Sequence, residues 1–245
     1  MKNQIASEFR KLTSTRSVYT MLAALLGSVA VAAVATVTDI EVSELQQPLE
    51  RQPFMWAVLT VVPLFTLLLG IRSFTDEFRH GSIVPTLLAS PSRARVLGAK
   101  LVTTAAGGVA FAAAAMTLAF AVGVPLLMAR GVEVTWSANA IAEVAGRLVV
   151  ATALWTAIGV GFGLAVRHQV AAVAGALIWI LAGEAVLSAF IPELGTYFPG
   201  AAGSALVGVN AKGLLAPAMA TVVLAGWAIV AAVSGGVLMH RRDVA

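Results

Sequence analysis

Residues 72–100, RSFTDEFRHGSIVPTLLASPSRARVLGAK, form the longest run in the chain that a lipid bilayer could not accept, and apolar segments flank it on both sides. The part FTDEFRHGSIVPTLLA predicts a helix with acids in its first turn, interrupted or bent at Gly81 and Pro85. Ser90-Pro91 predicts the start of the next span, because a capping hydroxyl precedes proline. Such an insert at a membrane face suggests a docking region for a soluble partner. An ordinary basic loop is the alternative.

The composition is that of a membrane protein. Of the 245 residues, 59% are hydrophobic, only 11% are charged and none is cysteine, whereas soluble domains carry about 25% charged residues. The net charge of +4 does not predict a nucleic-acid partner, since the basic residues are divided between membrane faces and form no binding patch. Disulfides and thiolate metal sites are excluded.

Outside the charged insert, apolar runs of about the length of a membrane span recur along the chain. They cover residues 18–37, 54–71, 96–128, 141–166, 170–190 and 218–239. The sequence therefore predicts an all-α polytopic membrane protein with six transmembrane helices, built as a single transmembrane domain over residues 1–245.

Residues 1–17 predict an amphipathic helix that lies on the bilayer surface. Ile5, Phe9 and Leu12 fall on one helical face, with charged residues mostly on the rest. A cleaved signal peptide is the competing interpretation, but the apolar run that follows is too long for a typical signal. We expect a retained first span.

Two glycine-rich segments predict special packing. Gly159-Val-Gly-Phe-Gly163 contains a G-x-x-x-G inside the fourth span, which is typical of a close-packing helix face. The segment 191–217 is rich in Gly and Pro and carries few charges, so either a re-entrant or a surface helix pair is expected there, on the extracytoplasmic side.

The distribution of basic residues predicts the orientation. With six spans both termini share one side, and that side carries twelve of the 16 Lys and Arg residues, leaving four for the other side. By the positive-inside rule, both termini and the insert at 72–95 are cytoplasmic.

A search for catalytic chemistry is negative. The chain has no G-x-x-x-x-G-K-[ST], no H-E-x-x-H and no G-x-S-x-G. The histidines His80, His168 and His240 lie far apart in sequence at membrane edges, and we expect them to be solvated instead of metal ligands. No catalytic residue, metal site or bound cofactor is predicted.

Charged residues stand inside two of the apolar spans. Glu184 lies within the fifth span, where an ionisable group is costly and suggests function. Glu143 and Arg147 are spaced to pair on the fourth span. Arg147 and Glu184 should also lie at similar depth, so a structural Arg147–Glu184 pair and a role of Glu184 in substrate or proton handling are both expected possibilities.

The chain resembles an ABC-2 type (type V) permease, the membrane subunit of an ATP-driven exporter. The resemblance rests on SEFRKLTSTRS at 7–17, the insert at 72–100 and YFPGAAGSALV at 197–207, and on the order of elements along the chain. It implies a cytoplasmic coupling helix between spans two and three, and short outer helices between spans five and six.

The resemblance also implies partners and sites. Separate ABC ATPase subunits, carrying ATP and Mg, would dock on this chain, and a second permease copy or a paralogue would complete a dimer in the bilayer. The implied ATPase-coupling residues are Glu8, Phe9, Arg10, Phe74, Asp76, Glu77, Phe78, Arg79, Leu87 and Leu88. The implied substrate-pathway residues are Phe65, Thr66, Trp179 and Glu184.

The function expected from this resemblance is that of a non-enzymatic permease in the cell membrane, which exports a hydrophobic or amphiphilic substrate such as a drug, lipid or peptide. Two other classes stay open. One is a polytopic membrane enzyme, an intramembrane protease or a lipid-modifying enzyme, which would need clustered catalytic residues. The other is a passive immunity or scaffold protein.

Overall fold

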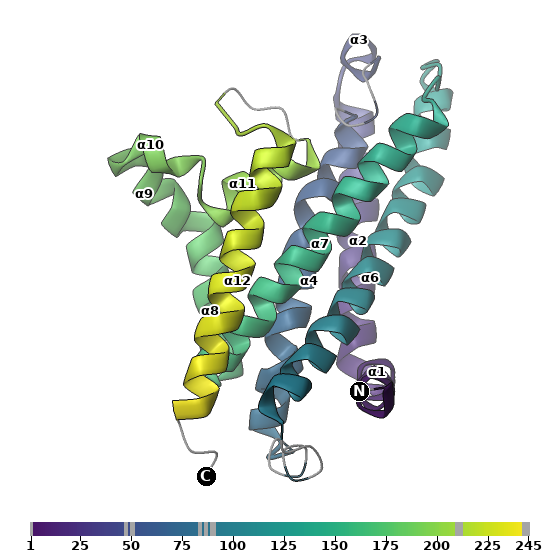
Figure 1. Cartoon of the computed structure of the whole chain (residues 1–245). Helices are drawn as coiled ribbons and strands as arrows, with labels where there is room; N and C mark the ends of the chain where they lie inside the picture. The colour runs from purple at the N-terminus through teal and green to yellow at the C-terminus, as the bar shows by residue number, and fades with distance from the viewer. Residues whose placement is uncertain are drawn as a thin grey trace.

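The structure is a computed structural model that describes residues 2–46, 49, 52–82, 85, 88, 92–208 and 213–241. Within these residues the regular structure is helical, and six helices are long and apolar enough to cross a membrane. The all-α polytopic fold predicted from the sequence is therefore confirmed. The spanning helices run roughly side by side through the bundle (Figure 1).

The bounds of the spanning helices extend slightly beyond the predicted apolar runs. They are α2 (Arg16–Asp39), α4 (Pro53–Arg79), α6 (Arg93–Ala129), α7 (Ala138–Val166), a fifth span made of α8 (Gln169–Ile178), the π-helix η2 (Trp179–Gly183) and α9 (Glu184–Phe190), and α12 (Pro217–Arg241). The shorter helices are α1 (Lys2–Ser14), α3 (Val42–Leu45), α10 (Pro192–Gly195) and α11 (Pro199–Val207).

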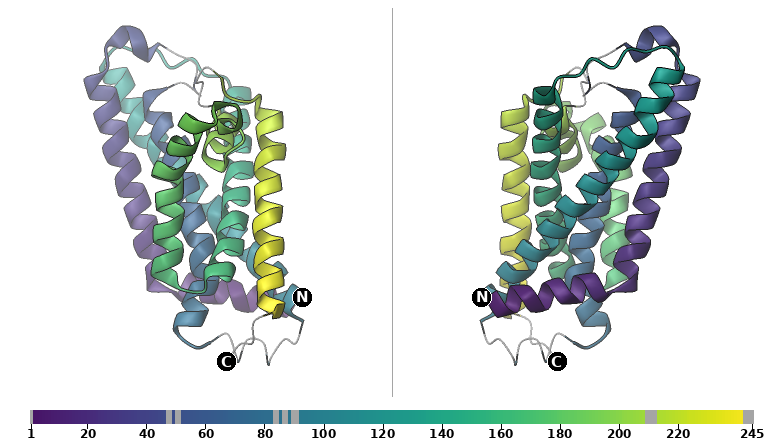
Figure 2. Two further views of the ribbon diagram at one scale, coloured as in Figure 1. Left: turned by 90° about the vertical axis from the view of Figure 1, so that its left-hand side faces the viewer. Right: turned by 90° about the vertical axis from the view of Figure 1, so that its right-hand side faces the viewer.

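The helix α1 lies across one end of the bundle, nearly perpendicular to the spans (Figure 2). Thr15 has extended backbone angles and separates α1 from α2. The end of α12, the last turns of α4 and the turn between α7 and α8 lie at the same end, which we call the α1 end. The opposite end, which carries α3 and α10, is called the α3 end.

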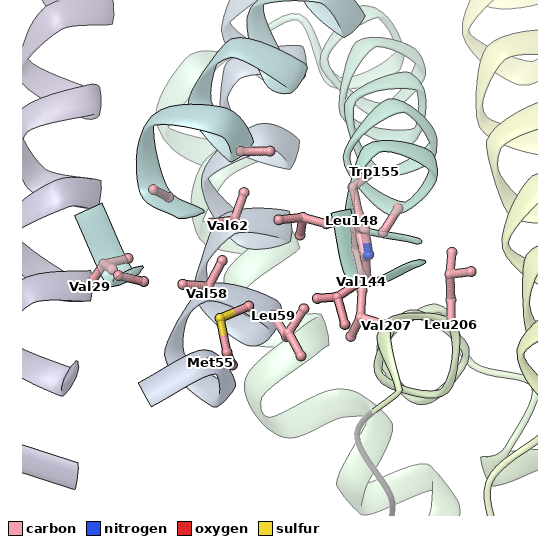
Figure 3. Packing of buried hydrophobic residues seen from close by; sticks show 14 of the residues in the cluster. Val29, Met55, Val58, Leu59, Val62, Val144, Leu148, Trp155, Leu206 and Val207 are labelled. Atoms are coloured by element: carbon pink, nitrogen blue, oxygen red, sulfur yellow. The ribbon is translucent and has the colours of Figure 1, made fainter. Parts of the chain in front are cut away.

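The core is organised around α4 and α7, the two most buried spans. Val58 and Leu59 of α4 lie opposite Val144 and Leu148 of α7 in one apolar cluster (Figure 3). The helices α2 and α6 flank this pair on one side, and α12 packs against α7 on the other. The fifth span is the least buried of the six.

Glycines allow α7 to approach two neighbours at once. A Cβ at Gly159 or Gly163 would collide with the backbone of α4 at Leu67 or Ile71, and one at Gly161 would collide with α12 at Ala231. Small residues are favoured where membrane helices touch, because backbones can then come within van der Waals distance. The close-packing face predicted from the glycine spacing is thus present, and it serves two helices.

The region around the charged insert differs from the prediction in one respect. The helix α4 continues without interruption to Arg79, so Asp76 and Glu77 lie in its last turns and not in the first turn of a separate helix. Gly81, with φ +66°, follows the end of α4. The next span starts after Ser92, whose hydroxyl accepts the N–H of Arg95 at 3.4 Å. The predicted cap at Ser90-Pro91 lies outside the described residues, as do residues 83, 84, 86, 87 and 89 of the predicted coupling region.

The segment after the fifth span contains two short helices, α10 and α11. Most residues of α11 are buried, and it packs against α12, α7 and α4. The indole N–H of Trp227 on α12 donates to the carbonyl of Tyr197 at 2.9 Å, which fixes the chain just before α11. The helix α11 is therefore part of the bundle interior at the α3 end.

Candidate functional site: buried charges at the two ends of the bundle

Four charged side chains form a closed network at the α1 end. Lys100 Nζ lies 2.8 Å from Glu8 Oε2 and 2.9 Å from Glu77 Oε1. Lys11 Nζ lies 2.7 Å from Glu8 Oε1 and 2.8 Å from Glu77 Oε1. The network joins α1, α4 and α6 and carries no net charge.

Lys100 is the centre of this network and is only 2% exposed. Its ammonium also donates to the carbonyl of Ser73 at 2.8 Å and lies 5.0 Å from the ring centroid of Phe74. All three of its hydrogens therefore have acceptors, as a buried ammonium requires. A buried cation with this set of partners ties α6 to α1 and to the end of α4.

The network shifts the pKa of its two residues on α1. Burial alone would raise the pKa of Glu8, but charge attraction and hydrogen bonds from Lys100 and Lys11 outweigh it and hold that pKa below its ordinary value. Burial opposes the charged form of Lys11 too, yet hydrogen bonds and attraction from Glu77 and Glu8 raise its pKa. Both groups therefore stay ionised around neutral pH.

The end of α4 is also held from its other side. Arg79 donates to the side-chain oxygen of Gln169 at 3.0 Å, and the guanidinium of Arg167 lies 5.2 Å from the ring centroid of Phe78. Asp76 pairs with Arg72 one turn earlier at 3.0 Å. The last two turns of α4 thus contact α1 and α6 through Glu77, and the α7–α8 turn through Phe78 and Arg79.

The predicted ATPase-coupling residues divide into exposed and buried sets. Phe9 is 49% exposed, and Arg10, Arg79 and Leu88 are exposed as well. Glu8, Phe74 and Glu77 are buried, so in this structure they present no surface to a partner and brace the helices instead. Asp76 and Phe78 are partly buried. Leu87 lies outside the described residues.

A cavity of about 280 Å³ adjoins the network. Its walls come from α1, the start of α2, the end of α4 and α6, and they include both carboxylates of the network and Arg72. The Oε2 atom of Glu77 is buried and has no hydrogen-bond partner among the described residues. The α1 end therefore has unfilled space beside its central charges.

The α3 half of the bundle holds a different kind of buried charge. Glu184 is 7% exposed, and its two oxygens accept the backbone N–H of Gly200 at 3.0 and 2.9 Å. The N–H of Ala201 and the indole of Trp179 are further hydrogen-bond partners of this carboxylate. Glu184 therefore caps the N-terminus of α11, where the helix dipole favours a negative charge.

A π-helix sets the position of Glu184. The N–H of Glu184 donates to the carbonyl of Trp179, five residues earlier, where an α-helix would use the residue four earlier. Gly200 is needed opposite, because a Cβ there would lie 2.5 Å from Glu184 Oε2. π-helical turns are rare and are often found at functional sites.

The predicted pair between Arg147 and Glu184 does not form in the structure. Arg147 bonds to Glu143 one turn earlier on α7, and the carboxylate of Glu184 bonds to α11. The prediction rested on an estimate of depth, and depth says nothing about which face of each helix carries the side chain. The alternative local pair, Glu143 with Arg147, is present.

The predicted pathway residues are placed separately. Thr66 is fully buried and its hydroxyl donates to the carbonyl of Pro63 at 2.9 Å, while Phe65 packs against the main apolar cluster. Trp179 and Glu184 line two neighbouring cavities, described below. The structure thus brings Trp179 and Glu184 together and leaves Phe65 and Thr66 apart from them.

Sequence reasoning missed Lys11, Lys100 and Trp155. A signal existed for Lys100, which stands two turns inside a long apolar helix, where an unpaired cation would be costly. Lys11 is three residues from Glu8, the spacing of a helical ion pair. Nothing in the pattern distinguishes Trp155 from other aromatic residues of the spans.

Among the described residues, no group of three or more His, Cys, Asp or Glu side chains could hold a metal ion. The buried carboxylates of Glu8, Glu77 and Glu184 are held by lysines and by backbone N–H groups.

Comparison with known proteins identifies the family. The family model described as "ABC-2 family transporter protein" matches residues 4–183, from α1 to the last residue of η2. A search of curated proteins gave no match. The matched region includes the whole charged network and ends one residue before Glu184. Since it covers most of the chain, this six-span membrane protein belongs to the ABC-2 family of transporter proteins.

Proposed function

We propose that this chain is the permease subunit of an ATP-driven exporter in the cell membrane, that it works as a dimer with a second permease, and that its α1 end is cytoplasmic and receives the ATPase subunits. Family membership supports a transport role, with ATP hydrolysis on a separate chain. The substrate class we propose is hydrophobic or amphiphilic.

The proposal rests mainly on the ion pairs that hold α1 against the spans. Phe9 and Arg10 lie exposed on α1, and Glu8, next to them in the chain, is bonded to Lys100 of α6. A force applied to the exposed side of α1 is therefore passed to α6 and, through Glu77, to α4. Packed elements joined by ion pairs move together more readily than they deform.

The same force reaches the fifth span. Because Arg79 and Phe78 contact the α7–α8 turn, a displacement of the end of α4 also acts on α8. The fifth span is the least buried and carries Glu184, so it is the span most free to respond. This gives a continuous mechanical route from a cytoplasmic motor to the α3 end.

The test is to co-express the chain with a candidate ABC ATPase and to compare two double variants. Phe9→Ala with Arg10→Ala removes the exposed contact on α1, and Glu133→Ala with Val134→Ala is the matched control at the exposed surface of the α3 end. We expect loss of ATPase copurification and of ATP-dependent transport in the first variant only. Retention of both activities in the α1 variant, with normal folding, would contradict the proposal.

A further inference from the structure

Two cavities of similar size meet in the half of the bundle that contains Glu184. The first, of about 270 Å³, is almost wholly apolar and lies between the fifth span and α12, with walls that include Leu67, Phe162, Trp179 and Val230. The second, of about 260 Å³, is more polar and includes Thr60, Glu184, Gly200 and Ser204. Trp155 and Ile180 belong to the walls of both.

Trp155, which lines both cavities, carries a donor without a partner in the described part of the chain. Trp155 is 5% exposed, and its indole N–H has no hydrogen-bond partner among the described residues. It lies at the wall formed by Gly203, where a Cβ would come within 2.7 Å of Nε1. Figure 3 shows the Trp155 side chain beside Val207 of α11. A buried donor without an acceptor is costly, which points to an occupant that supplies one.

The two polar groups together select the chemistry of the occupant. The Glu184 carboxylate lines the polar cavity and is an acceptor, already bonded to the N–H groups of Gly200 and Ala201 and to the indole of Trp179, whereas the Trp155 indole is only a donor. A hydroxyl group can donate to the first and accept from the second. An ammonium could pair with the Glu184 carboxylate but would leave the Trp155 donor without an acceptor, and an anion would be repelled by Glu184.

The order of the two cavities along the bundle matches the orientation of an amphiphile in one leaflet of a bilayer. On α4 the polar cavity uses residues 59–64 and the apolar cavity uses Leu67, which is nearer the α1 end. A molecule spanning both would place its polar end toward the α3 end and its tail toward the middle of the bundle. This is the orientation of lipids in the leaflet on that side.

We propose that these joined cavities form a binding site for an amphiphile with a neutral, hydroxyl-bearing polar end and an aliphatic tail. The hydroxyl bridges Glu184 and Trp155, and the tail lies between the fifth span and α12 among Trp179, Phe162 and Val230. This inference deepens the proposed function and rests on it only where the ligand is taken to be the exported substrate.

The experiment uses the full chain in lipid nanodiscs without any ATPase. The probe is a monoacylglycerol that carries a photoactivatable diazirine near the end of its acyl chain. The comparison ligands are the methyl ester of the same acyl chain, which cannot donate, and the matching alkylammonium. We expect saturable labelling of apolar-cavity residues such as Ala176 and Val230, competed by unlabelled monoacylglycerol and poorly by the two comparison ligands.

The variants separate the two polar contacts. Glu184→Gln and Trp155→Phe should each weaken the apparent Kd about five- to tenfold, the size expected for one lost hydrogen bond. Glu143→Gln, an exposed carboxylate on the outer half of α7, should bind as wild type. Thermal unfolding identifies any variant that fails to fold. If Glu184→Gln fails to fold, Trp155→Phe still tests the proposal.

Several results would overturn the inference. Labelling that does not saturate, or that maps to α2 and α6, means ordinary surrounding lipid. If the ester or the ammonium competes as well as unlabelled monoacylglycerol, the polar end is not recognised through a hydroxyl. If Glu184→Gln and Trp155→Phe both bind the probe unchanged, water alone occupies the polar cavity. Because no ATPase is present, failure here leaves the α1 docking test untouched, and failure of that test leaves this binding result intact.

Discussion

The two ends of the bundle bury carboxylates in opposite ways. At the α1 end, Glu8 and Glu77 are neutralised by two lysines from other parts of the chain. In the α3 half, Glu184 contacts no cation among the described residues and is held by backbone N–H groups of α11. Paired charges resist separation and bind helices together, whereas a carboxylate held by dipoles keeps lone pairs for another molecule. We propose that the first end transmits force and that the second binds a ligand.

The largest expected effect is at the centre of the charged network. Lys100→Met leaves two buried carboxylates with only Lys11 between them, and it should lower the free energy of unfolding by about 3–5 kcal/mol. Unfolding in detergent, followed by circular dichroism, measures this loss. Arg95→Met, an exposed position on the same helix, is the control and should change little.

A combined variant identifies the cause of that loss. Adding Glu8→Gln and Glu77→Gln to Lys100→Met removes the uncompensated charges and should recover part of the stability. If the triple variant is no more stable than Lys100→Met, loss of packing explains the effect and the electrostatic interpretation is wrong.

The next effect depends on pH. The pKa of Glu8 is lower in the folded state than its ordinary value of 4.5, so its stabilisation is present above that value and is lost as pH falls through the folded pKa. Glu8→Gln should therefore cost about 1.5–3 kcal/mol at pH 7. Wild type and variant should converge in melting temperature as the pH falls below the folded pKa of Glu8. A difference that persists unchanged into acid would rule out this linkage.

Lys11, on the same helix, changes the stability with pH in the opposite direction. Its pKa is raised above the ordinary value of 10.5, so its contribution is complete below that value and is lost only as pH rises through the folded pKa. The attachment of α1 should thus be strongest between these acidic and basic limits.

A smaller effect is expected where Glu184 meets α11. Gly200→Ala places a methyl group 2.5 Å from Glu184 Oε2, and the carboxylate must move away from the N-terminus of α11. We expect a loss of about 1–3 kcal/mol in unfolding free energy and weaker monoacylglycerol binding. Gly146→Ala is the matched control, since nothing lies within 4 Å of its Cβ position. Equal effects of the two substitutions would show that the close contact is unimportant.

The smallest effect on stability is expected at the exposed face of α1. Phe9→Ala with Arg10→Ala removes no buried contact, so the unfolding free energy should stay within about 0.5 kcal/mol of wild type. A large loss of stability would show that these residues support the fold, and it would weaken their assignment as a docking surface.

The helical spans were predictable because apolar length and glycine spacing are local properties of the sequence. The runs around α2, α6 and α12 and the packing of Gly159 and Gly163 needed no knowledge of tertiary contacts. The sequence also showed that Glu184 is unusual, since a carboxylate inside an apolar run requires a partner.

The identity of that partner was not predictable. Glu184 bonds to backbone groups of Gly200, and backbone donors exist everywhere in a sequence, whereas Arg147 was the conspicuous charged candidate. The charged network was hidden for a related reason. Glu8 and Glu77 resemble surface residues beside membrane helices, and only the crossing of α1 over α4 and α6 buries them against Lys100.

The single π turn before Glu184 has a consequence for how this span can change. It inserts one residue beyond the α-helical repeat, so the chain after Gly183 is rotated relative to α8 by roughly 100°. Deleting one residue of Trp179–Gly183, or straightening the turn into regular α-helix, would swing Glu184 out of line with α11 without breaking the span. Straightening this π turn would be enough to withdraw the carboxylate from the polar cavity.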